Sequence, residues 1–123
     1  FGLGYVGAVS AACFARNGHE IVGVDTNASK VQSFNAGMAP VVEPGLDDLM
    51  AEGVRSGRIR ATSSVNEAVN HTDLSIVCVG TPSRPNGSLN LDAVETVSSQ
   101  IGTSLADKDD GHLIMLRSTV LPG

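Results

Sequence analysis

Residues 1–7 read Phe1-Gly2-Leu3-Gly4-Tyr5-Val6-Gly7 and carry glycine at the spacing G-x-G-x-x-G. The sequence after this stretch predicts a helix, because apolar residues recur at three- and four-residue steps: Val6, Val9, Cys13 and Phe14. Gly18 ends the predicted helix. Residues 20–25 (EIVGVD) then read as a buried strand that closes on an acid, Asp25. A glycine turn, a helix, a strand and a terminal acid form the first half of a dinucleotide-binding unit.

Each glycine of the turn has a separate predicted role. Gly2 allows a tight turn from strand to helix, Gly4 lets a pyrophosphate approach the backbone, and Gly7 lets the helix pack closely on the sheet. The N–H groups at the helix start, at the positive end of the helix dipole, would then hold the phosphates.

The acid predicts which dinucleotide binds. Asp25 follows Gly7 by 18 residues, close to the spacing of an acid that accepts ribose hydroxyl protons. A carboxylate there repels a 2′-phosphate, so the sequence predicts NAD rather than NADP. Two alternatives stay open: a plain strand-to-helix turn, and a methyltransferase, which also has a glycine-rich first turn and an acid after its second strand.

Composition narrows the class of protein. With 123 residues, 41% of them hydrophobic, the chain has the size of one globular α/β domain. A net charge of −5 argues against a nucleic-acid or acidic-membrane surface, and no apolar run reaches membrane-spanning length. Two cysteines, Cys13 and Cys78, do not make a disulfide framework, and we interpret both as small buried hydrophobes in a reducing, cytoplasmic compartment.

The two ends of the sequence predict a piece cut from a longer reading frame. Phe1 stands one residue before the glycine turn, whereas a strand needs about five residues. The last residues, 121–123, read as a loop. We therefore expect the first strand of the sheet to be present only as a stub.

The rest of the chain alternates helices and strands. Helices are predicted over residues 28–36 with Asn27 as N-cap, from Glu43-Pro44 to Gly57, over 64–70 with a Ser64/Glu67 capping box, and after Asn90 with an apolar face of Val94, Val97, Ile101 and Leu105. Strands are predicted at 59–62, 74–79 and 112–116, and the three histidines are read as surface residues. With the strands at 1–3 and 20–25, the fold class is α/β: a doubly wound parallel sheet of five strands, truncated at both ends.

Ligands of open α/β sheets bind beyond the carboxyl ends of the strands. Three predicted strand ends carry polar side chains suited to one dinucleotide: Asp25, Thr81 and Thr119. Lys30 lies close in sequence to Asp25, and its spacing alone is equally compatible with a cofactor contact and a solvated helix lysine.

Five segments together resemble the UDP-glucose/GDP-mannose dehydrogenases, the nucleotide-sugar 6-dehydrogenase family. They are Gly2 to Gly7, Gly23 to Asp25, Glu43 to Leu46, Val79 to Pro82, and Arg117 to Gly123, and they span the whole chain in order. Cys78 and Leu121 resemble the GDP-mannose 6-dehydrogenases more than the UDP-glucose enzymes.

The resemblance implies a Rossmann-type NAD-binding domain of an enzyme that oxidises the C6 alcohol of a nucleotide sugar to a carboxylate. Such enzymes use two NAD⁺ in succession and pass through an aldehyde and a cysteine-bound thioester. The cofactor residues of the family map onto the glycines of the turn and onto Tyr5, Val6, Asp25, Lys30, Thr81 and Thr119. No metal is implied, and the full-length parent is expected to be a homo-oligomer.

The resemblance also places the catalytic cysteine, and most contacts to the nucleotide sugar, in a second domain that these 123 residues do not contain. This chain is therefore expected to bind NAD without turning over sugar. Two other functions stay open, a UDP-glucose 6-dehydrogenase and a non-catalytic module that senses nucleotides.

Overall fold

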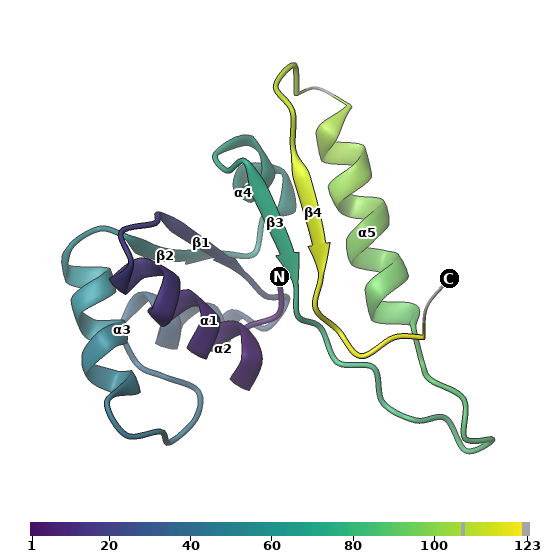
Figure 1. Ribbon diagram of the computed structural model, residues 1–123, viewed down its shortest axis with the longest axis horizontal. Coiled ribbons are helices and arrows are strands. Elements are labelled where there is room, and N and C mark those ends of the chain that lie inside the picture. The colour runs from purple at the N-terminus through teal and green to yellow at the C-terminus, as the bar shows by residue number, and fades with distance from the viewer. Residues whose placement is uncertain (107, 122–123) are drawn as a thin grey trace.

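A computed structural model describes residues 1–106 and 108–121, so Pro122, Gly123 and the start of the predicted 107–111 connection lie outside the described residues. Helices and strands alternate along the chain (Figure 1), and their bounds are α1 Tyr5–Arg16, β1 Ile21–Val24, α2 Ala28–Asn35, α3 Leu46–Arg55, β2 Ile59–Thr62, α4 Val65–Asn70, β3 Leu74–Val77, α5 Asp92–Leu105 and β4 Leu113–Leu116. This order confirms the predicted α/β class.

The strands form two parallel pairs. Ile21 of β1 lies opposite Ile59 of β2, and Leu74 of β3 lies opposite Leu113 of β4. The described residues contain four strands rather than the five expected. The difference is at residues 1–3, which have backbone contacts to strands but are not themselves assigned as one.

Residues 1 and 2 join the two pairs into one sheet. The Phe1 nitrogen donates to the Ile76 carbonyl at 2.8 Å, and the Phe1 carbonyl accepts from the Cys78 N–H at 2.8 Å. On the other side, the Gly2 N–H donates to the Val24 carbonyl at 2.8 Å. The lateral order is therefore β2, β1, residues 1–2, β3, β4, which agrees with the expected stub.

Two separate apolar clusters hold the elements together. The larger one joins α1, α2, α3 and β2 through buried residues that include Leu3, Phe34, Met50 and Ile59. The smaller one joins α4, β3 and α5 through Val69, Val77 and Ile101, with Val97 and Leu105 packed against it. The predicted apolar face of α5 is therefore confirmed.

The buried face of α1 differs from the prediction. Its buried residues are Ala8, Ala11, Ala12 and Ala15. Val6 and Phe14 are each 39% exposed, and Cys13 is only half-buried. Small alanine side chains allow the helix backbone to lie close to its neighbours, whereas Phe14 lines a cavity together with residues of β1 and β3.

Two helix starts also differ from the prediction. The helix expected at Glu43-Pro44 begins at Leu46, because Gly45 takes a left-handed conformation with φ 79° that no helix continues. The α5 helix begins at Asp92 after Leu91, although Asn90 still accepts a hydrogen bond from the Asp92 N–H at 2.9 Å.

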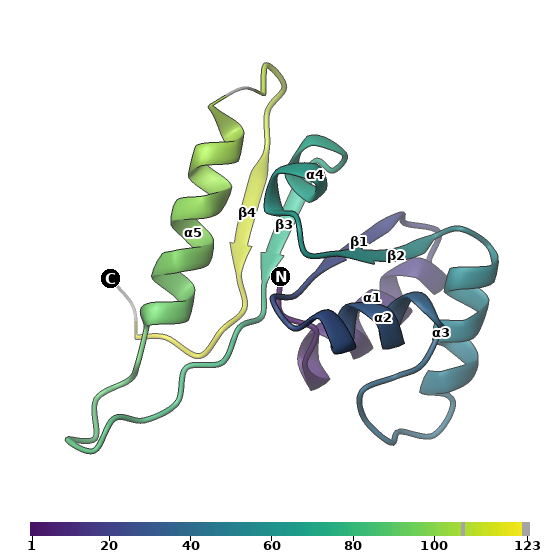
Figure 2. The same cartoon turned by 180° about the vertical axis from the view of Figure 1, so that it is seen from behind.

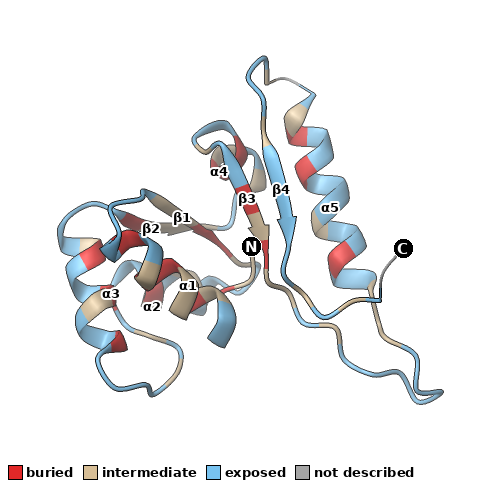
Figure 3. Ribbon diagram, in the orientation of Figure 1, coloured by how far each residue is buried: buried red, intermediate tan, exposed pale blue. Residues whose placement is uncertain are grey.

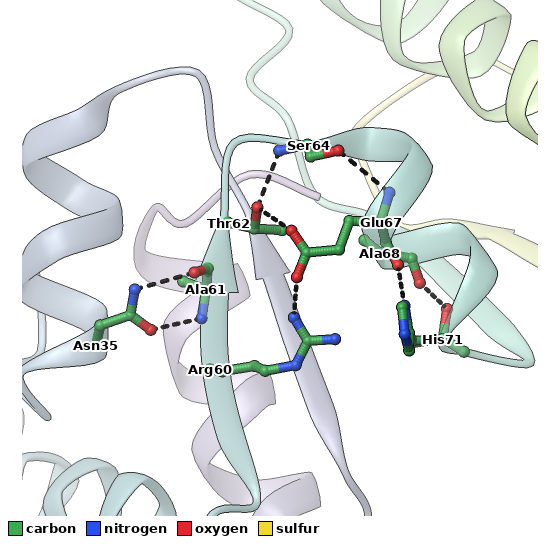
Figure 4. A network of polar contacts seen from close by, with 9 residues as sticks. Asn35, Arg60, Ala61, Thr62, Ser64, Glu67, Ala68 and His71 are labelled. Atoms are coloured by element: carbon green, nitrogen blue, oxygen red, sulfur yellow. Dashed lines mark hydrogen bonds and ion pairs between the residues drawn. The ribbon is translucent and has the colours of Figure 1, made fainter.

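Figure 4 shows the connection from β2 to α4. The Ser64 hydroxyl accepts from the Glu67 N–H at 3.2 Å, as the predicted capping box requires. The second bond of a capping box, between the Ser64 N–H and the Glu67 side chain, is indirect here. The Ser64 N–H donates to the Thr62 hydroxyl, and this hydroxyl donates to Glu67 at 2.7 Å. Glu67 also pairs with Arg60. The network therefore fixes α4 to the end of β2.

The β4 strand is exposed over its full length (Figure 3). Its residues Leu113, Ile114, Met115 and Leu116 are between 44% and 62% exposed. In the described part of the chain β4 pairs only with β3. None of the described helices has the length and apolarity that a membrane crossing needs.

Candidate functional site

The carboxyl ends of β1 and β3 converge beside the N-terminus (Figures 1 and 2). The glycine turn leads from this point into α1. The polar residues predicted at strand ends, Asp25, Thr81 and Thr119, therefore follow β1, β3 and β4 at one edge of the sheet.

The three glycines of the turn have different surroundings. Gly2 has φ 91°, and a Cβ there would lie 2.8 Å from the Cys78 carbonyl oxygen. A Cβ on Gly7 would overlap the carbonyl oxygen of Gly2. A Cβ on Gly4 would meet no atom within 4 Å. Gly2 and Gly7 are thus required by the turn itself, whereas the space over Gly4 is open, as an approaching pyrophosphate requires.

The start of α1 presents free backbone donors. Its first helical bond runs from the Ala8 N–H to the Gly4 carbonyl at 2.9 Å. Helix geometry therefore leaves the N–H groups of Tyr5, Val6 and Gly7 without intrahelical partners. The first turn carries no acidic side chain, so its positive end is suited to a phosphate.

Asp25 joins the end of β1 to the glycine turn. One carboxylate oxygen accepts from the Leu3 N–H at 2.9 Å and the other from the Asn27 N–H at 2.9 Å. Partial burial acts to raise the pKa of Asp25, but these two N–H donors and Lys30 outweigh it, so the pKa lies below its usual value. Asp25 is a carboxylate at neutral pH, and its two oxygens have acceptor capacity left for ribose hydroxyls.

Lys30 lies beside Asp25. Its ammonium nitrogen is 3.6 Å from the carboxylate, and its side chain is 43% exposed against 11% for Asp25. Asn27 sets this geometry, because its side chain caps α2 by accepting from the N–H groups of Ser29 and Lys30. The positively charged Lys30 ammonium group therefore lies at the Asp25 side of the site.

Thr81 and Thr119 are brought together across the exits of β3 and β4. The Thr81 hydroxyl donates to the Thr119 carbonyl at 2.8 Å. Ser118 strengthens the same junction by donating to the Val79 carbonyl at 2.7 Å. These hydrogen bonds hold the two loops together at this edge of the sheet, and Thr119 is exposed there.

Tyr5 makes a contact that the sequence did not predict. Its hydroxyl donates to a Glu43 carboxylate oxygen at 2.8 Å, which raises the pKa of Tyr5. Tyr5 is 52% exposed and Val6 is 39% exposed, so both border solvent at the start of α1. The contact joins residues 38 positions apart, and no local pattern could have indicated it.

Arg117 also connects two distant parts of the chain. Its guanidinium donates to the Ser10 hydroxyl of α1 at 2.6 Å, across 107 positions.

His112 was expected at the surface but is half-buried, with Nε2 2.8 Å from the hydroxyl of the buried Ser75. Cys78, expected to be buried, is also only half-buried.

Comparisons with known proteins agree with this arrangement. The model of the UDP-glucose/GDP-mannose dehydrogenase family, NAD binding domain, matches residues 1–123. GDP-mannose 6-dehydrogenase of Azotobacter vinelandii is 57% identical over 100% of this chain and 28% of its own length. UDP-glucose 6-dehydrogenase of Haloferax volcanii is 45% identical over 98% of this chain and 28% of its own.

A solved structure shows the same fold. The crystal structure of a ternary complex of GDP-mannose dehydrogenase from Pseudomonas aeruginosa matches with a TM-score of 0.98 and 48% identity, over 100% of this chain and 28% of that one. The chain thus spans less than a third of the length of each of these relatives. It belongs to the UDP-glucose/GDP-mannose dehydrogenase family and matches the NAD-binding domain of that family.

Proposed function

We propose that this chain is the NAD-binding part of a nucleotide-sugar 6-dehydrogenase that oxidises GDP-mannose to GDP-mannuronate and reduces two NAD⁺ per sugar. The observation that carries the proposal is the pairing of an open Gly4 with an ionised Asp25 at one edge of the sheet. These two features suit the pyrophosphate and the adenosine ribose of one NAD.

The proposed contacts follow the geometry of the edge. The N–H groups of Tyr5, Val6 and Gly7 hold the pyrophosphate, Asp25 accepts from the ribose hydroxyls, and Lys30 contributes positive charge beside it. Thr81 and Thr119 lie along the far end of the same edge. Bound NAD supplies the hydride acceptor, and this chain binds and orients it.

GDP-mannose is proposed as the substrate class because the relative that acts on it shares 57% of residues, against 45% for the UDP-glucose relative. Cys78 and Leu121 favour the same choice. We assign the catalytic cysteine and most contacts to the sugar nucleotide to a second domain, and propose a homo-oligomeric, cytoplasmic parent.

Calorimetric titration of the 123-residue chain tests the cofactor site. We expect saturable binding of NAD⁺ and much weaker binding of NADP⁺, because the Asp25 carboxylate repels a 2′-phosphate. The Gly4→Val variant is the control, since its side chain fills the open space while no atom lies within 4 Å of its Cβ. A folded Gly4→Val variant that retains NAD⁺ affinity would contradict the proposed cradle.

Turnover by a full-length parent tests the reaction. Two NADH per GDP-mannose consumed would support the proposal, whereas two per UDP-glucose would change the substrate. NAD⁺ binding with no NADH from either sugar would favour a nucleotide-sensing module. NADH formed by the 123-residue chain alone would contradict the division between two domains.

A further inference from the structure

Tyr5 extends from the first turn of α1 to the connection between α2 and α3. Its hydroxyl donates to a Glu43 carboxylate oxygen at 2.8 Å. Tyr5 is also the first residue of α1, so its own N–H is one of the free donors that the proposed pyrophosphate site uses. One residue thus supplies a backbone donor of the cofactor site and a side chain whose position depends on Glu43.

The backbone around Glu43 is fixed on both sides, in the connection between α2 and α3 (Figure 1). Before Glu43, the Ala39 N–H donates to Asp47 Oδ1 at 3.3 Å, and Val41 packs against the larger apolar cluster. After it, the Leu46 N–H donates to the Glu43 carbonyl at 3.1 Å. The connection therefore holds the Glu43 carboxylate at a set place beside α1.

The start of α3 does not use this carboxylate. Gly45 is the N-cap of α3 and makes no side-chain bond, and the acidic side chains of the first turn are Asp47 and Asp48. In the described part of the chain, the hydrogen bond of the Glu43 side chain is to Tyr5. Glu43 therefore acts on the start of α1 rather than on the start of α3.

The contact is exposed, which limits its value for folding. Tyr5 is 52% exposed, and Glu43 also lies at the surface. Water can replace either partner of such a bond, so its net contribution to stability is small. What the bond fixes is the aromatic ring, because without it the tyrosine side chain could take other staggered positions at the start of α1.

We propose that Glu43 is a positioning residue of the NAD site and acts through Tyr5. By accepting from the Tyr5 hydroxyl, Glu43 holds the aromatic ring as a wall beside the pyrophosphate before the cofactor arrives. The cofactor then binds without the entropic cost of ordering this side chain. The inference rests on the proposed NAD site and adds to it a residue that does not itself touch the cofactor.

Charge alone predicts the opposite effect. The Glu43 carboxylate and the NAD pyrophosphate are both negative, so a carboxylate near the site repels the cofactor, and its removal should strengthen binding. Positioning of Tyr5 predicts weaker binding instead. Because the two effects differ in sign, the NAD⁺ affinity of a Glu43→Ala variant distinguishes them.

Calorimetric titration of variants with NAD⁺ tests the positioning. We expect Glu43→Ala and Tyr5→Phe each to weaken binding about fivefold, the scale of one ordered side chain, and the double variant to weaken it no further. Glu43→Gln keeps an acceptor oxygen and should retain the affinity. The control, Asp48→Asn, removes a charge from the first turn of α3 and leaves the Tyr5 bond in place, so it should not weaken binding.

Three outcomes of this titration would overturn the proposal. The first is unchanged or tighter binding by Glu43→Ala. The second is a double variant in which the two losses add, because Glu43 would then act independently of Tyr5. The third is a Glu43→Gln variant as weak as Glu43→Ala, because the acceptor oxygen would then not be what matters.

A second readout follows the bond without cofactor. The sequence contains one tyrosine and no tryptophan, so ultraviolet absorption of the phenolate reports on Tyr5 alone. The hydrogen bond to Glu43 raises the pKa of Tyr5. We expect the midpoint of the absorption titration to fall toward the ordinary tyrosine value of about 10 in Glu43→Ala. Equal midpoints in two chains that circular dichroism shows to be folded would overturn the proposal. Because no NAD⁺ is present, this failure is distinct from failure of the proposed function.

Discussion

Gly4 and Gly7 are three residues apart in one turn, and their surroundings differ. A Cβ on Gly7 would overlap the Gly2 carbonyl oxygen, whereas a Cβ on Gly4 meets open space. We expect Gly7→Ala to lower the free energy of unfolding by about 1–3 kcal/mol, the usual cost of overpacking. Gly4→Ala should leave that free energy nearly unchanged. Urea unfolding of the two variants measures the difference, and equal stability would contradict it.

Asp25 supports the fold as well as the proposed cofactor site. Its folded pKa is lowered, so its stabilising contribution is fully present above the ordinary aspartate pKa of about 4 and is lost as pH falls through the folded pKa. Asp25→Asn keeps the shape and one acceptor oxygen but not the charge. We therefore expect the variant to be less stable than the parent at pH 7, with the gap closing toward pH 3. A gap independent of pH in urea unfolding would contradict this assignment.

Three elements meet at Lys108. Its ammonium donates to the Val69 carbonyl at 3.0 Å and to Thr72, and it lies 3.2 Å from Nδ1 of His112. His112 in turn contacts Ser75 of β3. Partial burial and the nearby Lys108 lower the pKa of His112, although Thr72 and Asp73 oppose the shift. This arrangement therefore holds His112 neutral between the end of α4 and the start of β4.

The lowered pKa of His112 predicts how stability depends on pH. The unfolded chain binds a proton near pH 6.5 more readily than the folded one, so stability should rise as pH increases through that region. His112→Gln, which cannot take up this proton, should show a smaller rise between pH 5 and 8. Parallel pH profiles of the urea midpoint would mean that His112 does not contribute.

The elements were predictable where their signals are local. Asn27 and Ser64 cap helices as their residue types indicate, and the apolar spacing of α5 gives its buried face. The buried face of α1 was not predictable from apolar spacing, because the alanines pack closely and are buried, whereas Phe14 lines a cavity with residues of β1 and β3. The start of α3 was also missed, since Pro44 can begin a helix but the conformation of Gly45 prevents it.

In the candidate site, too, some features follow from local sequence and others depend on packing. The glycine turn and Asp25 follow from sequence spacing, because one strand and one helix place them. The contacts of Glu43 with Tyr5 and of Arg117 with Ser10 join residues 38 and 107 positions apart. Such contacts depend on how the elements pack, and no periodicity in the chain indicates them.

The whole molecule consists of two halves that residues 1 and 2 join. One half contains β1, β2 and the larger apolar cluster, and the other contains β3, β4 and the smaller cluster. The Glu67 contacts with Arg60 and Thr62 and the contact of Arg117 with Ser10 add further connections between the halves. The proposed NAD site draws Asp25 and Lys30 from the first half and Thr81 and Thr119 from the second.

NAD⁺ should therefore stabilise both halves together. At 100 times its dissociation constant, a ligand specific for the folded state adds about 2.7 kcal/mol to the free energy of unfolding. We expect NAD⁺ to produce this gain and to slow amide exchange in β3 and β4 as well as in β1 and β2. The folded Gly4→Val variant should show neither effect. Protection confined to β1 and β2 would remove Thr81 and Thr119 from the site, because a ligand that contacted both threonines would also slow exchange at the exits of β3 and β4.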